Sequence, residues 1–238
     1  MERILCIVIG YVFGLFQTGY IYGRLNHVDI RDFGSGNAGT TNTMRVLGKK
    51  AGIITYFGDS LKAVFAIVLI YFIFRNTTDN MFILKMYTGL GVILGHNFPF
   101  YMKFRGGKGI AATSGVIFGL GDWRLVLLAF FTFVIVTVVS KYVSLGSLCM
   151  AAGFFVEFVI FAVLKMLPLS GNSIVEGIVL AFIISALAFI KHHANIQRLL
   201  NGTERKIGQS KNKKEENRYG RYSNFRSRRL GTRHRSFA

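Results

Sequence analysis

Residues 53–74 read IITYFGDSLKAVFAIVLIYFIF, and this stretch decides the fold class. Apart from Asp59 and Lys62 it carries no charged side chain, and a helix of about 20 apolar residues crosses the hydrocarbon core of a bilayer. Further apolar runs fall at 4–22, 81–98, 110–120, 125–139, 143–164 and 174–190. The first of these lacks an A-x-A cleavage pattern, so we expect one uncleaved helix there. The sequence therefore predicts an all-α, polytopic membrane protein.

The composition excludes an ordinary soluble protein. Hydrophobic residues make up 52% of the 238 residues and charged residues 17%, whereas soluble domains carry about 25% charged residues. A chain this apolar is not a disordered one either. The two cysteines, Cys6 and Cys149, lie in separate apolar runs, so we expect neither a disulfide framework nor a metal site.

Positive charge is unevenly spread along the chain and predicts the topology. The formal net charge is +18, and residues 191–238 hold 14 Lys or Arg against three Glu. The loops at 23–52 and 99–109 are also basic, and such short loops stay in the cytoplasm. The short runs 110–120 and 125–139 fit one broken span, a re-entrant segment plus a span, or two short helices. Two crossings place the basic C-terminus inside, so we predict seven transmembrane helices, two of them short, with the N-terminus outside.

Residues 34–45, GSGNAGTTNTMR, form a loop rich in glycine and small polar side chains. Glycine permits the left-handed backbone conformations that turn successive N–H groups towards an anion. Arg45 adds a planar guanidinium that suits phosphate. The loop is therefore a candidate phosphate site, and a flexible connection between helices is the alternative.

Residues 95–109, GHNFPFYMKFRGGKG, form a second glycine-rich loop. Gly106, Gly107 and Gly109 surround Lys108 just before a predicted helix, and a helix N-terminus with free N–H groups favours an anion. The spacing is not that of a Walker A loop. His96 beside this loop is a candidate base or hydrogen-bond donor. A basic loop that only sets the topology is the alternative, although two such loops on one membrane face favour a phosphate site.

Other polar side chains stand at the ends of the apolar runs or inside them. His192 and Asn195 have i, i+3 spacing after the last run, so they share a helix face with Arg198 three residues further on. Asp59 and Lys62 have the same spacing inside a span, where ionisable groups are functional candidates. The alternatives are an ordinary basic helix end for the first set and a solvated pair for the second.

These motifs resemble those of the bacterial integral-membrane acyl-phosphate:glycerol-3-phosphate acyltransferases. Residues 34–45 are similar to that family's first motif, G-S-G-N-x-G-A-T-N-x-x-R, with Thr41 in place of the usual Ala. Residues 95–113 are similar to the second, G-H-x-x-P followed by K-F-x-G-G-K-G and A-T, and residues 192–204 to the third, H-x-x-N-I-x-R-L-x-x-G-x-E. The pair Asp59 and Lys62 and the segment 142–145 also fit, and the resemblance covers residues 1–207.

The resemblance implies transfer of a fatty acyl group from acyl phosphate to the 1-hydroxyl of glycerol 3-phosphate. It implies an active site that faces the cytoplasm at the bacterial inner membrane. The expected partners are the two substrates and membrane lipid, with no cofactor, no metal and no obligate protein partner. On this basis the expected site residues are Ser35, His96, His192 and Asn195 as catalytic; Ser35, Gly36, Asn37, Thr40, Asn42, Arg45, Lys103, Gly106, Gly107, Lys108 and Gly109 as phosphate-binding; and Asp59, Lys62, Ser144, Arg198 and Glu204 as supporting.

A membrane transporter or channel for an organic phosphate is the alternative function, because glycine-broken spans also occur there. No internal repeat is evident and the polar motifs crowd one membrane face, which favours the enzyme. We expect a membrane-embedded acyltransferase domain at 1–207 and a basic, disordered tail at 208–238. The tail is expected to contact anionic lipid, with RNA or the ribosome as the alternative.

Overall fold

The computed structural model describes residues 1–209, so the predicted tail lies almost wholly outside the described residues. Within residues 1–209 every regular element is helical, which confirms the all-α prediction. In chain order the elements are α1 (Glu2–Gly14), α2 (Thr18–Leu25), the 3-10 turn η1 (Ile30–Asp32), α3 (Thr40–Leu47), α4 (Lys49–Phe74), α5 (Met81–Asn97), the 3-10 turn η2 (Phe100–Met102), α6 (Ile110–Leu120), α7 (Trp123–Ser140), α8 (Val143–Val163), α9 (Asn172–Lys191) and α10 (His193–Leu200).

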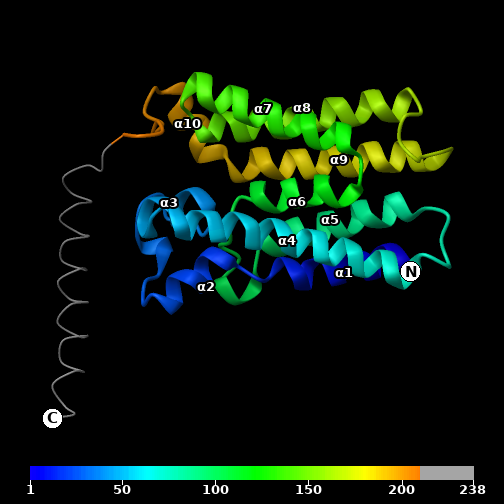
Figure 1. Ribbon diagram of the computed structural model, residues 1–238, viewed down its shortest axis with the longest axis horizontal. Helices are drawn as coiled ribbons and strands as arrows, with labels where there is room; N and C mark the ends of the chain where they lie inside the picture. Colours follow the sequence, from blue (N-terminus) through cyan, green and yellow to red (C-terminus); the bar gives the residue numbers. More distant parts are fainter. Residues whose placement is uncertain (210–238) are drawn as a thin grey trace, which may run out of the picture. The chain divides into compact units, whose positions relative to one another are not determined.

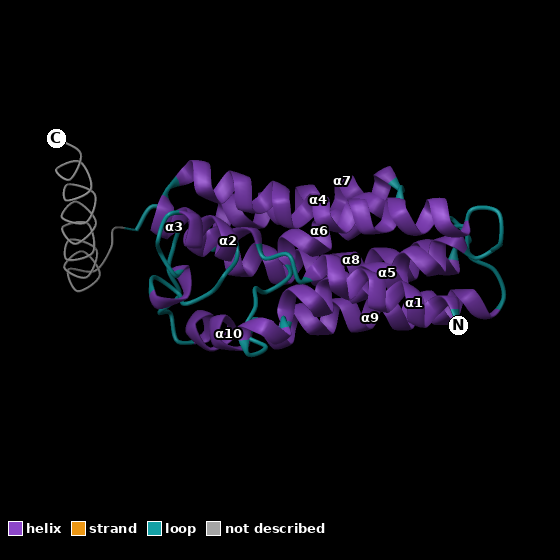
Figure 2. Cartoon of the chain, turned by 90° about the horizontal axis from the view of Figure 1, so that it is seen from below, coloured by secondary structure: helices purple, strands orange, loops and turns teal. Residues whose placement is uncertain are grey.

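The long helices of the compact unit Met1–Arg205 lie side by side along one direction (Figure 1). The start of α1 lies at one end of this bundle. The short helices α2, α3 and α10 gather at the other end, and Figure 2 shows the same arrangement after a quarter turn. The elements that carry the first and third motifs therefore share one end of the bundle.

Five helical segments are long and apolar enough to cross a membrane: Glu2–Leu25, Lys49–Phe74, Trp123–Ser140, Val143–Val163 and Asn172–Lys191. The chain is therefore a multi-pass membrane protein. The two remaining predicted spans are also helical, namely α5 with 17 residues and α6 with 11. Residues 110–139 form two helices, α6 and α7, joined at Gly121 and Asp122; α7 has 18 residues and is long enough to cross a membrane, so of the two helices expected to be short only α6 is. The φ of 85° at Gly121 is a left-handed conformation that glycine adopts without strain.

The first apolar run is not one helix, contrary to the prediction. Helix α1 ends at Gly14 and α2 begins at Thr18. Gln17 between them has φ −97° and ψ 88°, and its side-chain amide donates to the Gly14 carbonyl at 3.3 Å. Non-helical backbone at membrane depth is stable only where protein groups satisfy it, so the break requires polar partners from neighbouring helices.

Helices α1 and α5 pack with their backbones in close contact. Gly10 and Gly14 of α1 face Gly91 and Gly95 of α5, and each pair has the G-x-x-x-G spacing that lets membrane helices approach closely. A β-carbon added to any of the four would lie 2.2 to 2.3 Å from a carbonyl oxygen of the facing helix. This contact therefore accepts no side chain, and it fixes α5 against the break in the first span.

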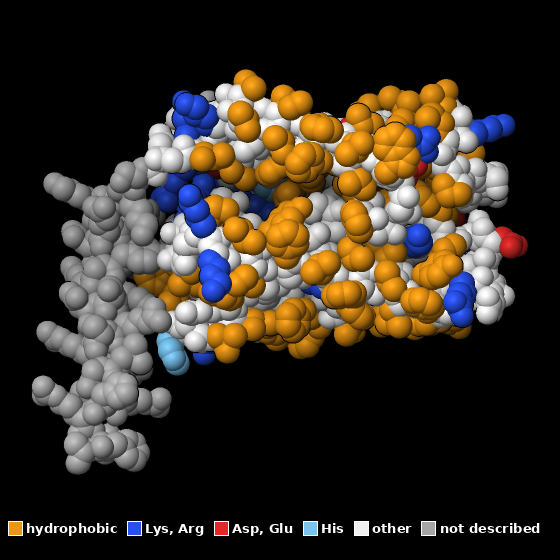
Figure 3. Space-filling model, in the orientation of Figure 1, with side chains coloured by type: hydrophobic (Ala, Val, Ile, Leu, Met, Phe, Trp, Pro, Cys, Tyr) orange, Lys and Arg blue, Asp and Glu red, His pale blue; other side chains and the backbone are white. Residues whose placement is uncertain are grey.

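The apolar core lies between α4, α5, α6, α7, α8 and α9. Phe154 and Phe158 of α8 are fully buried within it, with ring centroids 5.9 Å apart. The outer surface along the bundle is apolar as well (Figure 3). An apolar exterior around an apolar core is what helices in contact with lipid require, because the lipid chains are as apolar as the core.

Candidate active site

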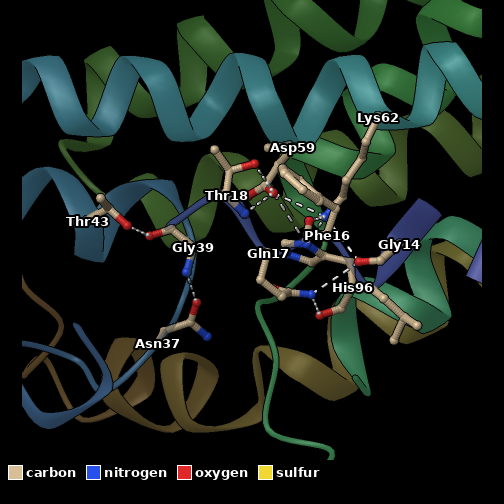
Figure 4. Close-up of polar contacts among 12 residues, drawn as sticks. Gly14, Phe16, Gln17, Thr18, Asn37, Gly39, Thr43, Asp59, Lys62 and His96 are labelled. Carbon is tan, nitrogen blue, oxygen red and sulfur yellow. Dashed lines mark hydrogen bonds and ion pairs between the residues drawn. The ribbon is translucent and has the colours of Figure 1, made fainter. Parts of the chain in front are cut away.

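A buried ionic group lies between α4 and α5, beside the break between α1 and α2 (Figure 4). The Lys62 ammonium lies 3.1 Å from Asp59 Oδ1, 2.8 Å from His96 Nδ1, and 2.6 and 3.2 Å from the carbonyl oxygens of Phe16 and Gly14. Asp59, Lys62 and His96 are each at most 5% exposed. Asp59 and Lys62 therefore form a buried ion pair, and the alternative of a solvated pair is wrong.

Two further residues, Gln17 and Thr18, complete this ionic group, and a third, Tyr101, contacts the helix break beside it; none was expected from the sequence. Gln17 Nε2 donates to the His96 carbonyl at 2.9 Å, and Thr18 Oγ1 donates to Asp59 Oδ1 at 3.0 Å. The Tyr101 hydroxyl donates, at 2.7 Å, to the carbonyl of Leu15, which lies in the break between α1 and α2. The signal for Gln17 and Thr18 was their polarity inside an apolar run. Tyr101 gave no signal, since tyrosine is common at membrane surfaces.

A second polar group forms around Glu204, which follows α10. Its Oε1 accepts from Ser144 Oγ at 2.9 Å and from Asn195 Nδ2 at 2.8 Å, and its Oε2 accepts from Arg198 Nε at 2.7 Å. Asn195 Oδ1 in turn accepts a hydrogen bond from the Lys108 ammonium. The loop before α6, the start of α8 and the third motif therefore meet in space, as expected for a site.

The Lys108 ammonium lies in a positively charged region. Burial lowers the pKa of Lys108 to about 8; the Glu204 carboxylate opposes this shift, while the charges of Arg198, Arg45 and Lys191 add to it. Arg45, from the first motif, thus lies within electrostatic range of the second and third motifs. Lys108 and the three cations whose charges act on it suit a ligand with more than one negative charge.

His192 is a buried histidine at the junction of α9 and α10. Its Nδ1 lies 2.7 Å from the carbonyl oxygen of Ala188. Because a carbonyl oxygen only accepts, Nδ1 carries the proton and Nε2 presents a lone pair. Burial and the charge of Lys108 lower the pKa of His192 to about 4, so the ring is neutral near pH 7.

The first glycine-rich loop is held together by two asparagine side chains. Asn42, buried on α3, accepts from the Ser35 N–H at 2.8 Å and donates to the carbonyls of Ile30 and Phe33 at 2.9 and 3.1 Å. Asn37 Oδ1 accepts a backbone N–H two residues further along at 2.8 Å. Both residues were expected to bind phosphate, but these contacts give them a part in shaping the loop.

The rest of the first loop has the backbone expected of an anion site. Gly34 and Gly36 have φ values of 62° and 72°, in the left-handed region that favours glycine. Ser35 and Gly36 are exposed, so both are open to a ligand. Thr40 begins α3, and its Oγ1 is buried and has no hydrogen-bond partner among residues 1–209.

The glycines of the second loop have two different roles. The N–H groups of Gly106 and Gly107 donate to the carbonyls of Asn97 and His96 at 3.3 and 3.1 Å. A β-carbon on Gly107 would lie 2.1 Å from His96 Nε2. We therefore attribute a packing role to these two glycines rather than donation to phosphate. Gly109, with φ 85°, precedes α6, and no side chain within residues 1–209 caps that helix, so its first N–H groups can face an anion.

Two lysines near the second loop lie differently from what the sequence suggested. Lys103, expected to bind phosphate, is exposed and belongs to neither buried group. Lys191, which was not expected in the site, donates to the Asn97 carbonyl at 3.0 Å and lies 4.7 Å from the centre of the Phe98 ring. A lysine at the end of an apolar run is usually a snorkelling side chain, so the sequence gave no signal for it. In the described part of the chain, no cluster of His, Cys, Asp and Glu is suited to hold a metal.

Comparison with known proteins places the chain among related sequences. Residues 4–202 match the family profile described as Glycerol-3-phosphate acyltransferase. A protein of that name from Clostridioides difficile is 39% identical over 87% of this chain and 97% of its own length. One from Staphylococcus aureus is 35% identical over 87% of this chain and 98% of its own length.

Solved structures give the same result for the fold. The crystal structure of PlsY (YgiH), an integral membrane glycerol 3-phosphate acyltransferase, in its glycerol 3-phosphate form aligns with a TM-score of 0.75. It is 30% identical, and the alignment covers 87% of this chain and 96% of that one. Its lysophosphatidic acid form aligns with a TM-score of 0.73. The chain belongs to the glycerol-3-phosphate acyltransferase family.

Proposed function

We propose that this protein transfers a fatty acyl group from acyl phosphate to the 1-hydroxyl of glycerol 3-phosphate, giving lysophosphatidic acid and phosphate. Family membership supports acylation of glycerol 3-phosphate, the first acylation step of phospholipid biosynthesis. The observation that carries the proposal is the meeting of Lys108, Asn195 and Glu204, with Arg45 in electrostatic range. The PlsY structures contain glycerol 3-phosphate and lysophosphatidic acid, and phosphate is common to both.

The chemistry requires charge neutralisation more than a strong base. The 1-oxygen of glycerol 3-phosphate bonds to the acyl carbon, the bond from that carbon to the phosphate oxygen breaks, and the hydroxyl proton passes to the released phosphate. Phosphate is a good leaving group, so positioning and stabilisation of the oxyanion supply most of the rate. The acyl chain would lie among the apolar helices, where each buried methylene contributes roughly 0.8 kcal/mol.

The residues take roles according to where they lie. Ser35, Arg45 and Lys108 bind phosphate groups. His192, whose Nε2 has the lone pair, holds the attacking hydroxyl, and Asn195 holds the hydroxyl or the oxyanion; Asn195 is oriented for this because Lys108 and Glu204 fix its two amide atoms. His96, whose Nε2 lies beside Gly107, serves the same step. The other expected site residues support these groups.

The distribution of charge along the chain supports a topology. We infer that all seven helical segments cross the bilayer, with the N-terminus outside and the C-terminus in the cytoplasm. The basic loops at 23–52 and 99–109 support this orientation. The site then faces the cytoplasm at the bacterial inner membrane, where glycerol 3-phosphate is soluble and the acyl donor is in the lipid.

The deciding experiment uses purified protein in detergent with palmitoyl phosphate and glycerol 3-phosphate. We expect inorganic phosphate and lysophosphatidic acid in equal amounts. Palmitoyl-CoA is the parallel donor, and turnover with it alone would overturn the proposed donor. An organic-phosphate transporter would release no phosphate in detergent, so the same assay tests the alternative function.

The affinity for glycerol 3-phosphate is expected to depend on pH through Lys108. Phosphate binds the ammonium form, and burial lowers the pKa of Lys108 to about 8 in the free protein. The second ionisation of phosphate has a pKa of about 6, so the substrate charge is constant above pH 7. Affinity should therefore be level from pH 7 to 8 and fall by up to about tenfold per unit above pH 8. Calorimetric titration without acyl donor measures this, and Lys108→Met should remove the inflection.

The basic tail is expected to be dispensable for turnover. The family profile ends at residue 202, and Glu204 takes part in the site described above, so we expect no catalytic group from residues 208–238. We propose that the tail contacts anionic lipid, RNA or the ribosome. A chain that ends at Ile207 should keep kcat/KM within about twofold in detergent. Loss of turnover would show that the catalytic unit extends beyond Ile207.

A further inference from the structure

We infer that Lys62 is a positioning residue that keeps the proton of His96 on Nε2, so that His96 acts as a hydrogen-bond donor and not as a general base. The role of His96 in turnover rests on the proposed function. The position of its proton does not, because it is a property of the protein without substrate.

The contacts of the Lys62 ammonium decide where the His96 proton lies. An ammonium has three donors and no lone pair. Its neighbours Phe16 O, Gly14 O and Asp59 Oδ1 are all acceptors, and the ion pair with the carboxylate at 3.1 Å favours the ammonium form of Lys62. His96 Nδ1, at 2.8 Å, must therefore accept as well. A neutral imidazole whose Nδ1 accepts carries its proton on Nε2.

The protonated side of the ring faces the loop that carries Lys108. The missing side chain of Gly107 makes room for the ring, since a β-carbon there would lie 2.1 Å from His96 Nε2. Gly107 directly precedes Lys108, whose ammonium reaches Asn195. An N–H at this place can donate to a phosphate or a developing oxyanion. It has no lone pair with which to remove the proton of the attacking hydroxyl.

Lys62 is held firmly enough to fix the ring. The break between α1 and α2 leaves the Gly14 and Phe16 carbonyls without helical partners, and both bind the ammonium. Gln17, at the same break, holds the backbone carbonyl of His96 at 2.9 Å. The ring and the backbone of His96 are thus both tied to the broken helix, which gives the break itself a function.

His192 shows the opposite arrangement. Its Nδ1 donates to the Ala188 carbonyl, so its Nε2 has the lone pair. The charge of Lys108 acts on His192 as well, which places the two groups close together. The site therefore has His96 as a hydrogen-bond donor beside Gly107 and His192 as an acceptor near Lys108. The hydrogen of the attacking hydroxyl is then accepted by His192 or by the substrate phosphate.

Nitrogen NMR of protein with ¹⁵N-labelled histidine tests the tautomer directly, without substrate. The signals of His96 are assigned by their loss in His96→Gln. We expect Nε2 protonated and Nδ1 unprotonated for His96, and the reverse for His192. A protonated Nδ1 in His96 would overturn the inference whatever the activity. Absence of turnover with acyl phosphate would instead overturn the proposed function and leave the tautomer standing.

Kinetics test whether Lys62 acts through His96. Lys62→Met removes the ammonium that fixes both the tautomer and the orientation of the His96 ring, so kcat should fall by about 10²-fold, as for loss of a preorganised donor, with the KM for glycerol 3-phosphate within about threefold. In a His96→Gln background, Lys62→Met should cause no further loss, and a further loss of tenfold or more would contradict the inference. Lys85→Met is the matched control, because that lysine lies on the same helix as His96 but donates to the Leu120 carbonyl, at 3.5 Å, and lies 6.0 Å from the centre of the Tyr71 ring. If Lys62→Met does not fold, the wild-type spectrum still decides.

Discussion

Replacement of Lys108 by Met is expected to lower kcat/KM for glycerol 3-phosphate by about 10³-fold while the protein stays folded. Removal of one preorganised donor for developing charge costs about 10²–10³-fold in kcat, and Lys108 also contributes to binding of the phosphate. Methionine keeps most of the aliphatic volume, so the loss reports the charge and the hydrogen bond to Asn195. Phosphate release at saturating acyl phosphate measures the effect, together with the melting temperature.

Arg105→Met is the control for this substitution. Arg105 lies in the same loop, three residues earlier, but is exposed, and an exposed charge contributes little. We expect kcat/KM within about twofold of the wild type. If Lys108→Met kept more than a tenth of the wild-type value, the assignment of Lys108 to phosphate would be wrong.

The sequence predicts most of this fold because hydropathy alone places membrane helices. The short helix α6 spans Ile110–Leu120, the same range as the apolar run in the sequence. The long helices also lie on their predicted runs. The sequence did not predict the interruption at Gln17, because the open carbonyls of Gly14 and Phe16 are satisfied by Lys62, which is remote in the chain. No local pattern reports such a partner.

The sequence predicted which residue types form the candidate site, but not which of these residues contact one another. Glycine-rich loops beside cations indicated phosphate, but Ser144 and Glu204 are 60 positions apart and Lys108 and Asn195 are 87 apart. Only the packing of the helices brings them together. The sequence also did not distinguish glycines with left-handed backbone, such as Gly36, from glycines such as Gly107 that make room for a ring.

Substitution of Gly95 by Ala is expected to destabilise the protein by about 1–3 kcal/mol, the usual cost of overpacking. The new β-carbon would lie 2.2 Å from the carbonyl oxygen of Tyr11 and 3.0 Å from the α-carbon of Gly14. These atoms belong to helix backbones, so no rotation of a side chain relieves the clash and α1 must move away from α5. Thermal unfolding in detergent should show a lower melting temperature, by roughly 2–4 °C for each kcal/mol.

The same movement should reduce activity beyond the loss of folded protein. Gly95 directly precedes His96, and Gly14 supplies a carbonyl to Lys62, so separation of α1 from α5 pulls apart the contacts that orient the His96 ring. Gly153→Ala is the matched control, because a β-carbon on that α8 glycine meets its nearest atom at an ordinary 3.4 Å. Alanine also favours a helix over glycine by about 1 kcal/mol, so this control should melt at the wild-type temperature or above it. Equal melting temperatures for the two variants would show that close contact between α1 and α5 does not hold the site together.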